Sequence, residues 1–380
     1  MSATWLDRAA RLGREVQAYV PGLTLDEAAQ RAGVDPARVI KLSSNESPLG
    51  PSPRAAAAIR RHARRAHYYP SATAPELRAA LGRYVGASAD QIVVGGGSST
   101  LMHAIVTAFT TPDGEVITLV PGFSLHTETA AIHGRRIVTV PLDAPSFALD
   151  LHRLEATITP RTQLLFLARP NNPTSTLLPF RLLQAVAERA AEVGALVVSD
   201  EAYIEFADAP RRETAAVLVR GDVPRRPNVL VTRTFSKAFG LADLRVGYAV
   251  GTRESAAALE RANAKWPTGA LAQAAALAAL GDRRHLARTI ATVREGRRWL
   301  TRELARLGLN MTPAPQGNFL LVDVGTRGFK ARDFAGALLT GAGIAVRGDF
   351  GPRHVRITVG RPAHNRRLVA GVRRLLDASR

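Results

Sequence analysis

Residues 91–109 read QIVVGGGSSTLMHAIVTAF: a short apolar run, three glycines and a longer apolar segment. The first four residues have the β-branched character of a buried strand, and the segment from Ser98 to Phe109 is long enough for a helix. The chain then repeats this alternation. We expect strands at residues 115–120, 136–141, 163–168, 195–199, 228–232 and 246–250, and a helix at 179–193. The pattern predicts an α/β fold with a mainly parallel sheet covered by helices on both faces.

The pattern changes beyond about Arg253. Residues 255–281 are alanine-rich and helical in character, and residues 282–307 predict a long helix. Short strands are expected at 318–322 and 354–359. We therefore predict three parts: an N-terminal arm at 1–42 that joins the smaller domain, a large domain at 43–255, and a small α+β domain at 256–380.

The composition limits the classes of function. The net charge is +19, but the arginines are scattered in pairs such as Arg60-Arg61, without the long charged blocks of interaction tails, which favours a solvated surface over nucleic-acid binding. The chain has no cysteine, and His62 and His67 lack acidic companions, so we expect no metal site. It has no apolar run of about eighteen residues for a membrane span, and Met1 to Arg14 has no signal-peptide core, which predicts the cytoplasm.

Lysine is rare in this chain, with only Lys41, Lys237, Lys265 and Lys330. Arginine stays protonated, whereas a lysine amine can lose its proton and react with a carbonyl group. Lys237 lies in the run TRTFSKAFGL at residues 232–241, among hydroxyls and small residues. We therefore predict that Lys237 is the chemically used lysine.

Other distinctive residues follow expected strands, where open α/β sheets bind ligands. Gly95-Gly96-Gly97-Ser98-Ser99-Thr100 fits an anion seat at a helix start, and fits a plain glycine turn equally well. Asp200 ends an apolar run, where a carboxylate needs a cationic partner. Arginine inside an apolar strand indicates anion binding, most clearly at Arg356. Further candidate ligand-binding residues lie in or after the expected strands: Asn171, Asn172, Thr234, Ser236, Arg245 and Arg347.

In their order along the chain, these pieces resemble fold-type I pyridoxal-phosphate aminotransferases. Within that family they are similar to the histidinol-phosphate aminotransferase branch. The resemblance rests on residues 42–48 (LSSNESP), 69–70 (YP), 170–174 (PNNPT), 200–206 (DEAYIEF), 233–241 (RTFSKAFGL) and 355–360 (VRITVG). It implies an aspartate-aminotransferase-like large domain with a seven-stranded sheet, a smaller α+β domain, and pyridoxal 5'-phosphate as the cofactor.

The resemblance also implies roles for individual residues. Lys237 would hold the cofactor covalently and move the proton, Asp200 would keep the pyridine nitrogen protonated, and Phe123 would stack on the ring. Tyr203 and Asn172 would hydrogen-bond the ring oxygen. The phosphate would be held by Ser98, Ser99, Thr234, Ser236 and Arg245, together with Tyr69 of a second subunit in a homodimer. Substrate would meet Arg356, Arg347, Tyr19, Asn45 and Glu46.

The implied reaction moves an amino group from histidinol phosphate to 2-oxoglutarate in histidine biosynthesis. Three departures from the family pattern weaken the assignment of substrate: no acid follows the glycines at 98–100, Phe123 stands where tyrosine is common, and Ser175 replaces a glycine. The alternatives are an aminotransferase for aromatic or other amino acids of secondary metabolism, a decarboxylase of a phosphorylated amino acid, and a DNA-binding regulator with an aminotransferase-like domain. Only about 40 residues precede the first cofactor-type loop, which argues against the regulator.

Overall fold

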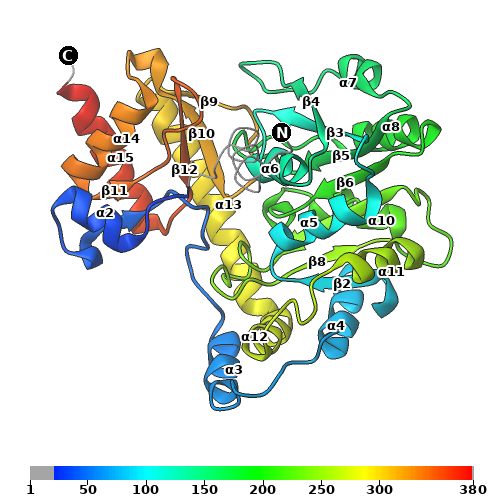
Figure 1. Cartoon of the computed structure of the whole chain (residues 1–380). Coiled ribbons are helices and arrows are strands. Elements are labelled where there is room, and N and C mark those ends of the chain that lie inside the picture. Colours follow the sequence, from blue (N-terminus) through cyan, green and yellow to red (C-terminus); the bar gives the residue numbers. More distant parts are fainter. Residues whose placement is uncertain (1–20, 379–380) are drawn as a thin grey trace, which may run out of the picture.

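A seven-stranded sheet forms the centre of the molecule in the computed structural model, which describes residues 21–378. The strand order is β2-β8-β7-β6-β5-β3-β4, and all neighbours run parallel except β8, which is antiparallel to both β2 and β7 (Figure 1). This confirms the expected mainly parallel sheet. Its strands are β2 (Ile92–Gly95), β3 (Glu115–Val120), β4 (Arg136–Pro141), β5 (Thr162–Ala168), β6 (Leu196–Asp200), β7 (Val229–Thr234) and β8 (Gly247–Val250).

The central strands are apolar on both faces because helices cover both. Leu164 and Phe166 of β5 pack into one buried cluster, while Leu165 and Leu167 pack into the other. Alternate residues of a strand point to opposite faces, so a continuous apolar run is what such a sheet requires. The helical elements around the sheet are α3 (Pro53–Ala63), α4 (Pro75–Val85), η2 (Ala89–Gln91), α5 (Ser98–Phe109), α6 (Ser124–Ile132), α7 (Leu151–Thr157), α8 (Phe180–Glu192), η3 (Ile204–Phe206), α9 (Pro210–Glu213), α10 (Ala216–Val219), α11 (Arg253–Ala262) and α12 (Ala270–Gly281).

A smaller region stands beside the sheet, and the long helix α13 (Arg283–Arg306) runs between the two (Figure 1). It combines an antiparallel sheet of order β12-β10-β9 with the parallel pair β1-β11. The pair joins the N-terminal segment to the C-terminal part of the chain. The elements are α2 (Leu25–Ala32), η1 (Pro36–Arg38), β1 (Ile40–Lys41), β9 (Asn310–Met311), β10 (Phe319–Asp323), η4 (Val324–Arg327), α14 (Ala331–Ala342), β11 (Ile344–Ala345), β12 (His354–Thr358) and α15 (Pro362–Asp377).

Residues 255–281 form two helices separated by a break. α11 packs against α5, and after residues 263–269 α12 packs against α3. Pro267 and Gly269 lie in the break, where proline has no N–H for a helical hydrogen bond. Both helices therefore pack against helices that precede residue 255 in the chain, and the domain division at residue 255 stays a prediction.

Two absences hold for the described part of the chain, residues 21–378. None of its helices has the length and apolar character needed to cross a membrane. It also contains no group of three or more histidine and acidic side chains arranged to hold a metal ion.

Candidate active site

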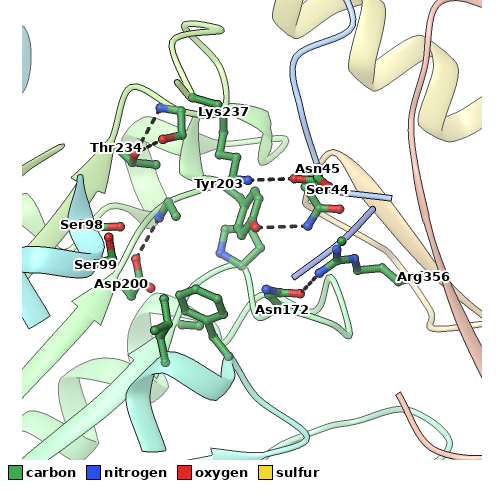
Figure 2. A pocket seen from close by; sticks show the side chains of 18 of the residues that line it. Ser44, Asn45, Ser98, Ser99, Asn172, Asp200, Tyr203, Thr234, Lys237 and Arg356 are labelled. Atoms are coloured by element: carbon green, nitrogen blue, oxygen red, sulfur yellow. Dashed lines mark hydrogen bonds between the residues drawn. The ribbon is translucent and has the colours of Figure 1, made fainter. Parts of the chain in front are cut away.

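The carboxyl ends of β5, β6 and β7 open onto a cavity of about 290 Å³. Ala168, Asp200 and Thr234, the last residues of these parallel strands, all line it. Thirteen of the residues expected from the sequence come together around this cavity: Asn45, Ser98, Ser99, Phe123, Asn172, Asp200, Tyr203, Thr234, Ser236, Lys237, Arg245, Arg347 and Arg356. They come from the large sheet and from the smaller region: Asp200 and Thr234 end strands of the large sheet, and Arg356 lies on β12 (Figure 2).

Lys237 follows β7 and points its amine into the cavity (Figure 2). The amine donates to the carbonyl oxygen of Ser44 at 3.1 Å and lies 5.6 Å from the centre of the Tyr203 ring. Burial first, and then the positive charge of Arg356, lowers the pKa of Lys237 to about 8. About a tenth of this amine is therefore uncharged at pH 7, far more than for an ordinary lysine, and the uncharged form is the one that a nucleophile or base requires.

The residues at the α5 end of the cavity have hydroxyl groups and a positive charge that suit a phosphate. Ser98 and Ser99 are the first residues of α5, whose free N–H groups and dipole favour an anion. The Arg245 guanidinium donates to Ser99 Oγ at 3.1 Å and to Ser236 Oγ at 3.2 Å, which gathers these groups together. Gly97 has φ +86, and a β-carbon there would lie 2.6 Å from Arg245 Nη2. Glycine is therefore needed at position 97, and the hydroxyls and guanidinium suit the phosphate of the cofactor.

Asp200 presents a buried carboxylate to the cavity, with only 3 % of its surface exposed. Its Oδ1 accepts from the N–H of Ala202 at 3.3 Å and from the hydroxyl of Thr232 at 3.3 Å. Its Oδ2 accepts from Nε2 of His126 at 3.2 Å. A buried carboxylate held in this way suits a cationic ring nitrogen, so the residues present fit a pyridoxal group with its phosphate at the α5 end.

His126 is a partner of Asp200 that was not predicted from the sequence. It lies on α6 with its ring stacked on Phe166 at 4.8 Å and 7°. The available signal was position, because His126 comes three residues after Phe123, just beyond the end of β3.

Behind the cavity, the neighbouring residues of the same strand ends form a buried ionic cluster. Glu201 Oε2 accepts from Arg233 Nε at 3.0 Å and Nη2 at 2.8 Å. Arg169 Nη1 lies 3.8 Å from Glu201 Oε1. Side chains alternate along a strand, so Asp200 and Thr234 face the cavity while Glu201 and Arg233 tie the same strands together on the other side.

Arg356 and Arg347 line the cavity from the smaller region. Arg356 donates to Asn172 Oδ1 at 2.6 Å and to the Ser43 carbonyl at 2.6 Å. The resemblance implies that Asn172 binds the ring oxygen of the cofactor, and in the structure its side-chain oxygen accepts a hydrogen bond from Arg356. Asn45 donates to the hydroxyl of Tyr203 at 3.1 Å, which links the loop at 43–46 to the cavity floor.

Two expected residues of the described chain, Tyr69 and Glu46, do not line the cavity. Tyr69 is 84 % exposed and rests against Trp266, with ring centres 5.1 Å apart. Glu46 pairs with Lys41 at 2.7 Å. Tyr19 lies outside the described residues. Roles for these three residues therefore stay predictions.

Comparison with known proteins agrees with this geometry. The family model for aminotransferase class I and II matches residues 37–372. A histidinol-phosphate aminotransferase from an Anaeromyxobacter species is 40% identical over 368 residues, covering 95% of this chain and 96% of the relative. Another from Akkermansia muciniphila is 38% identical over 363 residues, covering 95% and 97%. The crystal structure of histidinol-phosphate aminotransferase from Sinorhizobium meliloti, in complex with pyridoxal-5'-phosphate, superposes with a TM-score of 0.86 at 30% identity and covers all of both chains.

Proposed function

This chain belongs to the class I and II aminotransferase family, and we propose that it transfers an amino group from histidinol phosphate to 2-oxoglutarate with pyridoxal phosphate as its cofactor. The observation that carries the proposal is the position of Lys237. Its amine, with a pKa of about 8, projects into a cavity that holds the Asp200 carboxylate and the hydroxyl groups of Ser98 and Ser99. The likeness of nearly the whole chain to histidinol-phosphate aminotransferases supports the choice of substrate.

The cofactor would be held at several points. Arg245 and the hydroxyls of Ser98, Ser99, Thr234 and Ser236 would bind its phosphate, and Phe123 would cover one face of its ring. The hydroxyl of Tyr203 and the amide of Asn172 would lie near the ring oxygen. When bound, pyridoxal phosphate supplies an electron sink for the electrons left when the substrate carbon loses a proton.

The chain itself supplies the proton chemistry. Lys237 Nζ, uncharged in part near pH 8, would take the proton from the substrate carbon and later return it. Asp200, fixed by His126 and Thr232, would hold a positive charge on the ring nitrogen. The buried ionic cluster around Glu201 keeps the ends of β6 and β7 in register, so these two groups stay in place.

Two arginines suit a pair of substrates with different charges. Histidinol phosphate carries a phosphate and no carboxylate, whereas glutamate carries two carboxylates. A guanidinium binds either anion through paired hydrogen bonds, so Arg356 and Arg347 would serve both substrates in turn.

A homodimer and a cytoplasmic location form part of the proposal. The exposed rings of Tyr68, Tyr69 and Trp266 support an interface with a second subunit, since large exposed aromatic groups are common at protein interfaces. Tyr69 would then reach the cofactor phosphate of the second subunit. A role in histidine biosynthesis would place the enzyme in the cytoplasm.

Single-turnover reactions of the holoenzyme test the proposal. We expect histidinol phosphate and glutamate each to convert the absorbance of the bound cofactor to that of its aminated form. Phenylalanine and threonine phosphate should react far more slowly. A protein that reacts with phenylalanine and not with histidinol phosphate would be an aromatic aminotransferase instead, and release of carbon dioxide from threonine phosphate would indicate a decarboxylase.

A further inference from the structure

Arg347 and Arg356 are direct cross-strand neighbours. Each donates its backbone N–H to the carbonyl oxygen of the other, at 3.1 and 2.7 Å. Like charges placed opposite one another destabilise a pair of strands. The fold therefore needs something to offset this repulsion when no substrate is bound.

The two guanidinium groups differ in their hydrogen-bond partners. Arg356 donates to oxygens of uncharged groups, the side-chain amide of Asn172 and the backbone carbonyl of Ser43. Arg347 is paired with a carboxylate two residues away: its Nε donates to Asp349 Oδ1 at 2.8 Å, and its Nη2 donates to Asp349 Oδ2. The ring of Phe350 lies near both groups, 5.3 Å from Arg347 and 4.9 Å from Arg356.

The Asp349 carboxylate accepts hydrogen bonds from Arg347 in the way that an anionic group of a substrate would. Two parallel N–H···O bonds to one carboxylate are the geometry by which a guanidinium recognises carboxylate or phosphate groups. Burial raises the pKa of Asp349, but the hydrogen bond and charge of Arg347 outweigh this and hold it below its usual value, so the carboxyl is ionised at neutral pH. Asp349 also lines a wider cleft of about 850 Å³ that adjoins the cavity and shares Arg347, Arg356, Phe123 and Asn172 with it.

We propose that Asp349 is a specificity-determining residue, an internal counter-ion that the second anionic group of a substrate must displace from Arg347. A ligand with one carboxylate binds through Arg356 and leaves Asp349 in place. A ligand with a phosphate dianion or two carboxylates also engages Arg347 and has to exchange with Asp349. The exchange lowers affinity for such ligands and speeds their release, so one site can bind and release histidinol phosphate and 2-oxoglutarate alternately. This role rests on the proposed function.

The test replaces Asp349 by asparagine, which keeps the shape and removes the charge. In the Asp349→Asn holoenzyme we expect the Kd of inorganic phosphate, measured by calorimetry, and the KM values of histidinol phosphate and 2-oxoglutarate to fall about tenfold, since a hydrogen-bonded charge no longer competes. The KM of phenylalanine, with one carboxylate, should stay unchanged. Asp349→Ala should behave in the same way. The matched control is Asp323→Asn. Asp323, the last residue of β10, pairs with Arg353 at 2.8 Å, and neither residue lines the cavity or the wider cleft.

The outcomes separate this inference from the proposed function. Equal weakening of all ligands would make Asp349 a structural residue of the turn and overturn the inference. Unchanged phosphate affinity would overturn it as well. Tighter phosphate binding in a protein that never turns over histidinol phosphate would support the role of Asp349 and refute the substrate.

Discussion

At the scale of the residue, Lys237 makes stability depend on pH. Its pKa is about 8 in the folded protein, against an ordinary value of 10.5. Between these values the unfolded chain binds more protons, so stability rises with pH through this window and is lowest below pH 8. In cofactor-free protein we expect Lys237→Met to be more stable than the parent by about 2 kcal/mol at pH 7, allowing for partial solvent screening. The difference should vanish near pH 10.5, and urea unfolding across pH 7–10.5 measures it. A difference that does not change with pH would contradict the shifted pKa.

His126 is predicted to position Asp200 through their hydrogen bond. His126→Phe keeps the stacking on Phe166 and removes the hydrogen bond. We expect kcat to fall about tenfold, the cost of one hydrogen bond to a charged group, and the pH titration of the cofactor absorbance to shift. His103→Phe is the matched control, because His103 contacts His133 and does not line the cavity. Unaltered absorbance in His126→Phe would leave His126 with a packing role alone.

The sequence could identify the residues with unusual chemistry but not all of their partners. Lys237, Asp200 and Arg356 were recognisable because a rare amine, a carboxylate at the end of a strand and a buried arginine each need a reason to be there. Glu201 and His126 were not assigned, since their roles depend on which face of a strand or helix they occupy beside another element. The pairing of Arg347 with Asp349 depends on a turn whose geometry only the structure supplies.

At the scale of the element, the loop after β5 is joined to the smaller region by Ser175. This residue has φ +62, a conformation that favours glycine, and its Oγ accepts from the Gly317 N–H at 2.8 Å. Ser175→Gly relieves the strain but loses the buried hydrogen bond, while Ser175→Ala loses the bond and keeps the strain. We expect Ser175→Gly to lower the free energy of unfolding by about 1 kcal/mol and Ser175→Ala by about 2 kcal/mol. Urea unfolding of the three proteins measures this, and the reverse order would contradict the role of the hydroxyl.

Element types were more predictable than element ends. α2 has Thr24 as its N-cap and Gly33, at φ +65, as its C-cap, and these residue types are typical of the two ends of a helix. The alanine-rich stretch at 255–281 concealed a break, because a uniform apolar composition does not show where a helix changes its packing partner. The antiparallel direction of β8 depends on the path of the chain between β7 and β8, which periodicity does not report.

At the scale of the whole molecule, the proposed homodimer shares its active sites. A Lys237→Ala subunit keeps Tyr69, and a Tyr69→Ala subunit keeps Lys237. Mixing and refolding equal amounts should place the two intact residues together in one site of each mixed dimer, restoring about a quarter of the parental sites. Tyr68→Ala, at the neighbouring exposed tyrosine, is the control and should be active without mixing. No recovery on mixing, with mixed dimers present, would show that Tyr69 acts in its own subunit or not at all.

The most direct test of the central claim is to locate the covalently held cofactor. The purified holoenzyme is treated with borohydride, which fixes the link between a lysine amine and the cofactor, and its peptides are mapped by mass spectrometry. We expect the pyridoxyl group on Lys237, and we expect Lys237→Ala protein to yield no modified peptide. A pyridoxyl group on Lys41, Lys265 or Lys330, or an adduct that persists in Lys237→Ala, would contradict the account.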